Sequence, residues 1–272
     1  MDPIRAVFER LRRTHRKALI PFIMGGDPNL ATTRELVCAL AEAGADLIEV
    51  GIPFSDPLAD GPTIQRASSR ALAGRTSPAT VLEMLHRATA RICAPIVLLS
   101  YWNPIVQYGN GRARGADPSP FLRDARSAGC CGVIVPDLPI EEGQPFRQAA
   151  ARAGLAPIFL AAPTSPPERL RRIARCSEGF IYYVSVTGTT GARRRLSADW
   201  LHGVRQLKLI TTKPVCVGFG ISSPSQAASV ARVADGVIVG SALIRTMEPH
   251  LRHPRAAVNA ASSCLRRFRR AV

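Results

Sequence analysis

The chain has 272 residues, 46% of them hydrophobic, and a formal net charge of +16 at pH 7. This composition excludes a fibrous, low-complexity or disordered chain and suits a single large α/β domain. No apolar run approaches the roughly 18 to 20 residues of a membrane-spanning helix, and residues 1–17 lack the apolar centre of a signal peptide, so we expect a cytoplasmic protein without a membrane partner.

Short apolar runs recur along the chain, each followed by a stretch with the apolar spacing of an amphipathic helix. The predicted strands cover residues 18–24, 45–51, 95–101, 132–135, 156–161, 180–186, 214–218 and 236–239. The predicted helices cover residues 31–43, 62–73, 78–92, 145–153, 166–175, 198–207, 224–231 and 256–268. Serine followed by proline predicts capped helix starts at Ser77, Ser165 and Ser223.

This alternation predicts βαβ units that form a parallel sheet. Eight strand and helix pairs in about 250 residues favour a (β/α)8 TIM barrel, with a doubly wound open sheet as the next candidate. No linker or composition shift divides the chain, so we expect residues 1–272 to form one barrel domain with a short N-terminal helix. Residues 109–120 have no apolar period and predict a surface loop inserted before a helix.

In such a barrel, catalytic groups lie at the carboxyl ends of the strands. Glu49 interrupts an otherwise apolar strand and alternates onto the same face as Leu47 and Gly51. Burying an unpaired carboxylate costs several kcal/mol or raises its pKa until the group is neutral. Glu49 is therefore either a buried carboxylate satisfied by a neighbouring donor or a general acid or base tuned toward neutral pH.

The loop of residues 53–62 follows this strand and is too rich in turn formers for a helix or a strand. Asp60 in this loop either caps the helix that starts near Pro62 or places a second carboxylate at the same mouth of the barrel. Asp137 is a third acidic candidate, with a neighbour-orienting or turn role as the alternative. All five histidines lie in helical or terminal segments, so histidine catalysis and a metal site are not expected.

Glycine-rich turns follow the last three predicted strands, at residues 187–191, 218–221 and 240–243. Free backbone N–H groups in such turns and at a helix start bind phosphate, and barrels commonly bind phosphate in this region. The turns therefore predict a phosphate site, and the first of them could close over it as a lid.

The positive charge comes almost entirely from arginine, because only three of the 36 basic residues are lysines. Most arginine clusters lie in helical segments, which favours solvated helix faces over a selected anion surface. The chain also lacks exposed aromatic patterns and a known nucleic-acid motif, so no nucleic-acid partner is expected. Seven cysteines without a Cys-x-x-Cys pair indicate reduced thiols rather than disulfides or zinc.

Taken together, these motifs closely resemble the tryptophan synthase alpha subunit family over most of the chain. The most specific element of the resemblance is the block from Glu49 to Gln65. The other matching segments are Pro21-Phe22, Gly26-Asp27-Pro28, Pro136-Asp137-Leu138-Pro139, residues 156–159, Thr190-Gly191 and residues 218–222.

The resemblance implies a lyase that cleaves indole-3-glycerol phosphate to indole and glyceraldehyde 3-phosphate. Glu49 would protonate indole C3 and then take the hydroxyl proton, while Asp60, in a solvated loop, would pair with the indole N–H. Tyr182 would lie near the substrate. The indole pocket would be lined by Phe22, Leu99, Ile134, Leu160 and Phe219. The phosphate would be held by Thr190, Gly191, Gly220, Gly240 and Ser241.

The resemblance also implies a partner, a beta subunit that carries pyridoxal phosphate, commonly in an α2β2 assembly, so no cofactor is expected in this chain. The loop around Pro53, Phe54 and Asp56, with Asn103 and Pro104, would face that partner. One alternative is a lyase that acts alone. Another is a different phosphate-binding barrel, such as an indole-glycerol-phosphate synthase or a sugar-phosphate isomerase, although no lysine is placed for the synthase chemistry.

Two segments depart from the family pattern. Residues 188–191 read Gly-Thr-Thr-Gly, where many relatives carry valine in the second place, and three arginines follow at 193–195. Residues 109–120 form a longer loop than usual near the expected partner face. These departures concern the lid and the partner surface, not the predicted reaction.

Overall fold

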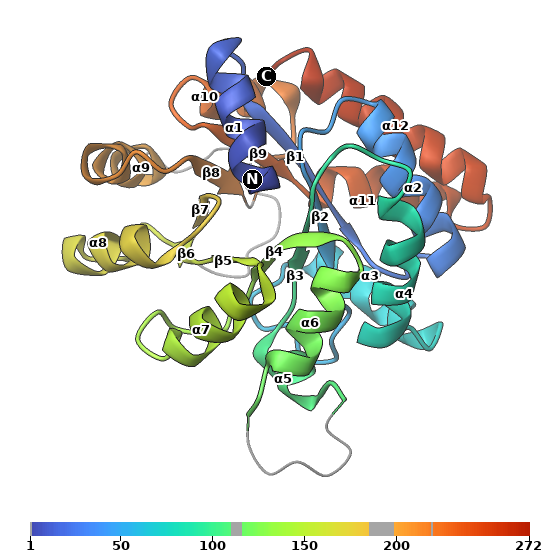
Figure 1. The fold of residues 1–272 in the computed structure, drawn as a ribbon. Helices are drawn as coiled ribbons and strands as arrows, with labels where there is room; N and C mark the ends of the chain where they lie inside the picture. Colours follow the sequence, from blue (N-terminus) through green and yellow to red (C-terminus); the bar gives the residue numbers. More distant parts are fainter. Residues whose placement is uncertain (1, 110–115, 185–198, 219) are drawn as a thin grey trace.

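The computed structural model describes residues 2–109, 116–184, 199–218 and 220–272, and its strands form one parallel sheet. The strands are β1 (Ala18–Met24), β2 (Ile48–Gly51), β3 (Ile96–Leu99), β4 (Cys130–Ile134), β5 (Ala156–Ile158), β6 (Leu160–Ala161), β7 (Ile181–Val184), β8 (Val215–Gly218) and β9 (Gly236–Val239). Their order is β5-β4-β3-β2-β1-β9-β8-β7-β6, and the outer helices surround them (Figure 1). Because β5 and β6 end this order but are consecutive in the chain, the sheet curls into a cylinder. The predicted TIM barrel is confirmed.

The fifth predicted strand, residues 156–161, is divided in the structure. The N–H of Phe159 donates to the Ser177 hydroxyl at 3.2 Å, and its C=O accepts from the Tyr182 N–H at 3.2 Å. Phe159 therefore stands outside the regular ladder, with β5 paired to β4 on one side and β6 paired to β7 on the other. The prediction of one continuous strand was wrong at this residue.

Twelve α-helices and one 3₁₀ turn occur in the described residues. They are α1 (Pro3–Arg13), α2 (Leu30–Glu42), α3 (Pro62–Ala73), α4 (Pro78–Thr89), α5 (Trp102–Gln107), α6 (Ser119–Ser127), α7 (Gln144–Ala153), α8 (Pro167–Cys176), α9 (Asp199–Ile210), α10 (Pro224–Ala231), α11 (Ser241–Met247), η1 (Glu248–His250) and α12 (Pro254–Arg269). Helix α6 follows the segment predicted as an inserted loop, of which residues 110–115 lie outside the described part. Helix α5 carries no local start signal and was not predicted.

Two of the three predicted serine caps are present. The Ser77 hydroxyl accepts from the Thr80 N–H in a capping box at the start of α4, and the Ser223 hydroxyl accepts from the Gln226 N–H at the start of α10. The third prediction was wrong, because Pro166 is the N-cap of α8. The Ser165 hydroxyl instead accepts from the Ala162 N–H at 3.1 Å, within the preceding turn.

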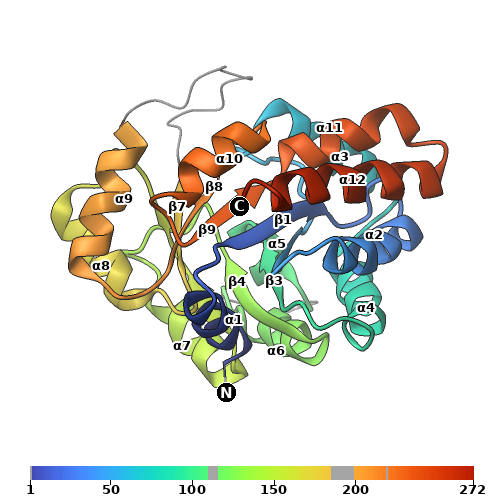
Figure 2. The same cartoon turned by 90° about the horizontal axis from the view of Figure 1, so that it is seen from above.

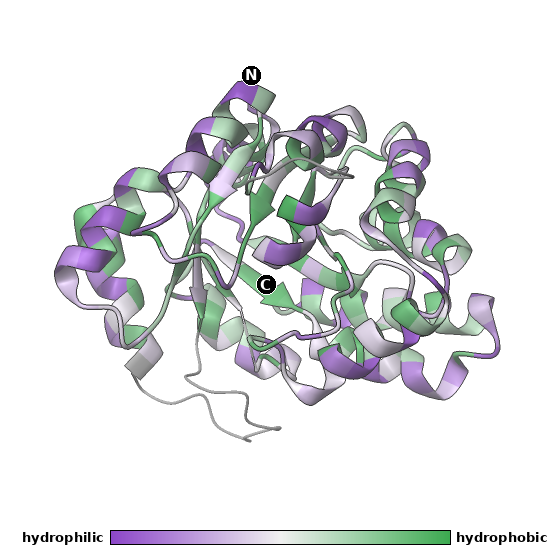
Figure 3. Ribbon diagram, turned by 90° about the horizontal axis from the view of Figure 1, so that it is seen from below, coloured by the Kyte–Doolittle hydropathy of each residue, from purple (hydrophilic) through white to green (hydrophobic). Residues whose placement is uncertain are grey.

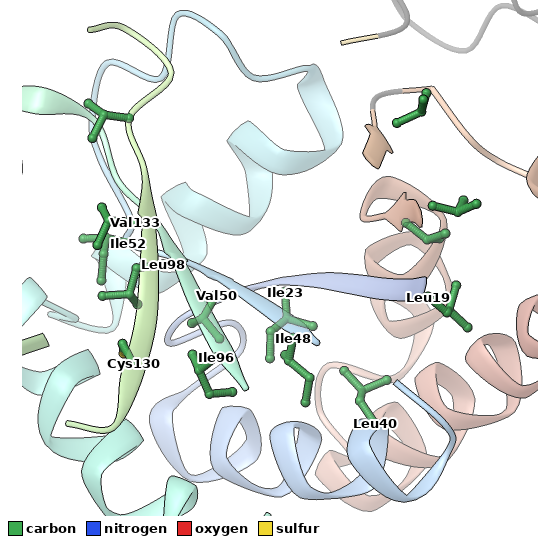
Figure 4. Close-up of a cluster of buried hydrophobic side chains, with 14 of the residues drawn as sticks. Leu19, Ile23, Leu40, Ile48, Val50, Ile52, Ile96, Leu98, Cys130 and Val133 are labelled. Atoms are coloured by element: carbon green, nitrogen blue, oxygen red, sulfur yellow. The ribbon is translucent and has the colours of Figure 1, made fainter. Parts of the chain in front are cut away.

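Alternation along the strands separates two apolar layers. Outward residues such as Leu19, Ile23 and Val50 pack against the helices in one cluster (Figure 4). Inward residues such as Ile20 and Phe22 fill the barrel in a second cluster. Figure 3 shows hydrophobic residues along the strands and hydrophilic residues distributed over the surrounding helices.

Helix α1 closes the amino end of the barrel. Its residues Ile4 and Phe8 belong to the interior cluster, with the Phe8 ring 6.0 Å from the Phe180 ring. Helix α1 lies beside β4, away from the outer ring of helices (Figure 2). The buried carboxylate of Asp46 accepts from Arg10 at 3.2 Å and from Arg269 at 2.6 Å, and so ties α1 and α12 to this end. The opposite end, where the strands finish, is left to form a site.

Within the described ranges, no helix is both long enough and apolar enough to cross a membrane. All seven cysteines are free thiols. The adjacent pair Cys130 and Cys131 lies on β4, where alternation sends one side chain to the outer cluster and the other to the interior cluster.

Candidate active site

A pocket opens at the carboxyl ends of the strands. It contains about 430 Å³ of space between protein atoms, part of it open to solvent. The lining residues are Phe22, Glu49, Asp60, Ile64, Leu99, Tyr182, Gly220, Ile221, Ile238, Gly240 and Ser241. Both predicted catalytic carboxylates and the predicted tyrosine therefore share one pocket.

Glu49 lies in the middle of β2, between Phe22 of β1 and Val97 of β3, and points into the barrel. Its side chain is 1% exposed, and neither carboxylate oxygen has a hydrogen-bond partner among the described residues. Burial, followed by the nearby charge of Asp60, raises the pKa of Glu49 to about 8. The alternative of a carboxylate satisfied by a neighbouring donor is therefore not what the structure shows.

Asp60 does not cap α3, because the N-cap is Gly61 and the helix start has no side-chain capping bond. The expectation of a solvated carboxylate was also wrong, since Asp60 is only 5% exposed. Burial raises its pKa to about 6, and a hydrogen bond from Tyr101 opposes that rise. The two carboxylates still differ in the expected direction, with Glu49 the weaker acid.

Tyr182 projects from β7 into the pocket and is buried. Burial, with a smaller contribution from the charge of Glu49, raises the pKa of the Tyr182 phenol well above its ordinary value, so the hydroxyl stays protonated. A Cβ atom on Gly218 would lie 2.4 Å from the Tyr182 hydroxyl oxygen. Glycine at position 218 is therefore required for this placement of the ring.

Two glycines shape the wall around Phe22. A Cβ atom on Gly51 would lie 2.8 Å from the Phe22 ring, and one on Gly240 would lie 3.1 Å from it. Gly240 is also the N-cap of α11, so the first N–H groups of that helix start at the pocket. The same glycine thus leaves room for an apolar wall and begins a set of backbone donors.

The structure places the other predicted residues as follows. Leu99, Gly220 and Ser241 line the pocket. Ile134 lies in the interior cluster and Leu160 packs against it, but neither lines the pocket. Phe219, Thr190 and Gly191, with the rest of the predicted lid, lie outside the described residues.

Asp137 stands apart from the pocket. It is exposed, and its carboxylate accepts from the Trp102 N–H at 2.9 Å. This bond gives a partner to one N–H group in the first turn of α5, which has none within the helix. This contact corresponds to the neighbour-orienting alternative.

None of the five histidines lines the pocket, and the described part of the chain contains no group of three or more His, Cys, Asp or Glu able to hold a metal ion.

Sequence reasoning missed several residues of the site. Ile64, Ile221 and Ile238 line the pocket. Signals were available for two of them, because Ile64 lies in the first turn of α3 just after the Asp60 loop and Ile238 alternates inward on β9. Tyr101 was also missed. Its hydroxyl oxygen accepts from the Ala59 N–H at 2.9 Å. The two residues are 42 positions apart in the chain, and no local sequence pattern predicts such a contact.

The fold and this pocket define a class: a TIM barrel with two buried carboxylates beside apolar walls at the catalytic end of the barrel, an arrangement suited to acid–base chemistry. Comparisons with known proteins specify it further. A family model described as tryptophan synthase alpha chain matches residues 8–272. The chain belongs to the tryptophan synthase alpha chain family.

Individual relatives agree with this assignment. The tryptophan synthase alpha chain of Geobacter sulfurreducens is 50% identical over 248 residues, which cover 91% of each chain. That of Carboxydothermus hydrogenoformans is 49% identical and covers 93% of this chain and 92% of its own. The expected family and activity class, a lyase of tryptophan biosynthesis, are confirmed.

Solved structures support the same family assignment. Tryptophan synthase subunit alpha from Legionella pneumophila superposes with a TM-score of 0.87 at 37% identity and covers 100% of this chain and 98% of its own. Tryptophan synthase from M. tuberculosis in its aminoacrylate-bound form gives a TM-score of 0.82 at 36% identity, covering 97% of this chain and 100% of that chain.

Proposed function

We propose that this chain cleaves indole-3-glycerol phosphate to indole and glyceraldehyde 3-phosphate, with Glu49 as the acid and base and Asp60 as the partner of the indole N–H. The observation that carries this assignment is the unpartnered carboxylate of Glu49, buried in a pocket with apolar walls. An enzyme acid needs a proton at neutral pH, and burial raises the pKa of Glu49 to about 8.

The reaction requires two proton transfers. Protonated Glu49 gives its proton to indole C3, which forms an indolenine cation. The resulting Glu49 carboxylate then removes the proton from the hydroxyl on the adjacent glycerol carbon. The electrons of that O–H bond form the aldehyde C=O, the carbon–carbon bond to C3 breaks, and its electron pair restores the aromatic ring. Glu49 ends protonated, as it began.

The second carboxylate acts on charge rather than on a proton. An ionised Asp60 accepts a hydrogen bond from the indole N–H and stabilises the positive charge that develops there when C3 is protonated. Its pKa of about 6 keeps it ionised at neutral pH. Tyr182, held protonated by burial, provides a neutral hydroxyl at the same pocket.

The two ends of the substrate differ in chemistry, and the pocket offers both environments. Phe22, Leu99 and Ile64 provide apolar contact for the indole ring. Gly240 and Ser241 provide backbone N–H groups for the phosphate at the start of α11, where an anion is favoured, and Gly220 provides one from the turn after β8. Thr190 and Gly191 would complete the phosphate-binding set, and Phe219 would complete the apolar wall, as the family resemblance implies.

The pH dependence of turnover follows from the two carboxylates. The active form has Asp60 ionised and Glu49 protonated, so we expect kcat to fall below pH 6 and above pH 8, given pKa values of about 6 and about 8. The measurement is the initial rate of indole release from pH 4.5 to 9.5 at saturating substrate. A rate that keeps rising through pH 9 would contradict protonated Glu49 as the acid.

The experiment that tests the proposed function uses the purified full chain with indole-3-glycerol phosphate, and follows indole and glyceraldehyde 3-phosphate in equal amounts. A sugar-phosphate isomerase substrate and the substrate of indole-glycerol-phosphate synthase serve as controls. Turnover of either control substrate, with no indole released, would assign the site to another phosphate-binding barrel enzyme.

The partner proposed for this chain is a tryptophan synthase beta subunit that carries pyridoxal phosphate, in an α2β2 assembly in the cytoplasm, with residues 1–272 acting as one domain. The loop between β2 and α3 supports this proposal, because Leu58 at its tip is 82% exposed. Pro53, Phe54 and Asp56 of the same loop, with Asn103 and Pro104, would complete the contact.

We expect Leu58→Ser to weaken stimulation of indole release by a beta subunit about tenfold, because an apolar contact at the interface is lost. The rate of the chain alone should not change. Leu209→Ser is the matched control, since Leu209 on α9 is 86% exposed and lies outside the loop. Titration of each variant with the beta subunit provides the measurement. Equal effects of both variants would argue against this loop as the contact, and full activity without any binding would favour a lyase that acts alone.

A further inference from the structure

The loop of residues 53–61 carries Asp60 but belongs to neither a helix nor a strand. Its tip is open to solvent at Ser55, Asp56 and Leu58, whereas Asp60 at its end is buried. A carboxylate that must meet one substrate atom needs a fixed backbone, and effective catalytic groups are held by neighbours that are themselves fixed. The residues that hold this loop are therefore part of how the site works.

Ser68 of α3 binds the main chain at the start of the loop. Its hydroxyl accepts from the Phe54 N–H at 2.9 Å and donates to the Phe54 C=O at 2.8 Å. The side chain is 1% exposed, so water does not compete for these bonds. Because both main-chain groups of one residue are bound, the clamp fixes the orientation of Phe54 as well as its position.

The same helix holds the other end of the loop. The Gln65 side-chain amide donates to the Asp60 C=O at 2.9 Å, and Gln65 lies three residues before Ser68, on the same side of α3. Tyr101, the N-cap of α5, also supports the loop, since its hydroxyl oxygen accepts from the Ala59 N–H and its ring centre lies 5.3 Å from that of Phe54. The loop is thus bound near both ends, with its tip left free.

Helix α3 is itself fixed to the barrel. Arg70 donates to both carboxylate oxygens of Asp27, at 2.7 Å and 2.8 Å, and Asp27 is buried in the turn after β1. Arg66 donates to Glu248, just after α11, at 2.8 Å. A paired, two-bond guanidinium contact is strong and directional. The helix therefore acts as a rigid support between the barrel and the loop.

We propose that Ser68 is a positioning residue for the lyase reaction: its hydroxyl clamps the main chain of Phe54 and so holds the Asp60 loop in its reactive conformation. This inference rests on the role proposed above for Asp60. Ser68 does not line the pocket and acts only through the loop.

The test compares Ser68→Ala with the pair Ser68→Thr and Ser68→Val. Thr and Val have nearly the same shape and differ in the hydroxyl, so this pair separates the clamp from the packing around it. We expect kcat for indole release to fall at least fivefold in the Ala and Val variants, with KM within twofold of the parent. The Thr variant should recover most of the turnover. Amide exchange at Phe54 should be faster in the Ala and Val variants only.

Two further variants control for stability. Ser69→Ala removes a neighbouring exposed hydroxyl that bonds only within α3, and should leave kcat unchanged. Ala71→Gly lowers the stability of the same helix without touching the loop, and should shift the unfolding temperature but not kcat. Equal turnover in the Thr and Val variants, or a loss in Ala71→Gly as large as in Ser68→Ala, would overturn the proposal.

The failure of this inference can be told from a failure of the proposed function. If Asp60→Asn keeps the parental turnover, the role of Asp60 itself is wrong. If Asp60→Asn loses activity while the Ser68 variants do not, the clamp alone is wrong. Amide exchange at Phe54 reports on the clamp without reference to activity.

Discussion

Glu49→Gln is expected to lower kcat for indole release by about a thousandfold, within the range attributed to a general acid and base, about 10² to 10⁴. Glutamine preserves the size of the side chain and adds no charge, so the pocket keeps its shape and substrate affinity should remain within a few fold. The amide cannot give a proton to C3 or take one from the hydroxyl. Single-turnover rates and direct substrate binding, measured on the same preparation, separate the two effects.

The same variant should be more stable than the parent at high pH, which shows that a loss of activity is not a loss of folding. The pKa of Glu49 is about 8 in the folded chain against 4.5 for the free group. A carboxyl group whose pKa is raised by folding contributes its full stability below pH 4.5 and loses it as pH rises through 8. The parent should therefore lose a few kcal/mol relative to Glu49→Gln between pH 4.5 and 9, at about 1.4 kcal/mol per pKa unit. Denaturant unfolding at pH 5 and pH 9 measures the change, and an equal difference at both pH values would contradict a buried, titrating Glu49.

The pattern of apolar residues was enough to predict the barrel, because each strand has one face toward the helices and one face toward the interior. Glu49 was identifiable for the same reason: a carboxylate at an inward position of an apolar strand is costly to bury, so it is either paired with a donor or used as an acid or base. Tyr182 and Phe22 follow the same alternation, so the sequence places them in the interior as well.

What could not be predicted depends on contacts between residues far apart in the chain. The division of the fifth strand at Phe159 needs the Ser177 hydroxyl, and the start of α5 needs the Asp137 carboxylate. The burial of Asp60 is another case. Its loop contains the residues of an exposed turn, and only Tyr101, which bonds to it from beyond β3, shows that the end of the loop lies inside. The sequence around each of these residues does not predict such long-range contacts.

Asp60→Asn is expected to lower kcat about a hundredfold, the scale observed when one electrostatic contact to a developing charge is removed. Asparagine keeps the size of the side chain and an oxygen that can accept the indole N–H, so the loss measures the negative charge alone. That charge matters most after C3 is protonated, when the ring nitrogen becomes positive. Substrate binding should change much less than kcat.

Asp137→Asn is the matched control, because it removes one negative charge beyond the end of β4 while keeping an oxygen for the Trp102 N–H, and Asp137 does not line the pocket. We expect its kcat within about threefold of the parent, since exposed charges are screened by solvent. The residual activity of Asp60→Asn should also lose the fall below pH 6. Its fall at high pH should remain but move to lower pH, because Glu49 still titrates and the Asp60 charge that helps to raise its pKa is gone. If Asp60→Asn and Asp137→Asn lose activity equally, the charge of Asp60 does not stabilise the protonated indole. The same conclusion follows if kcat of Asp60→Asn still falls below pH 6.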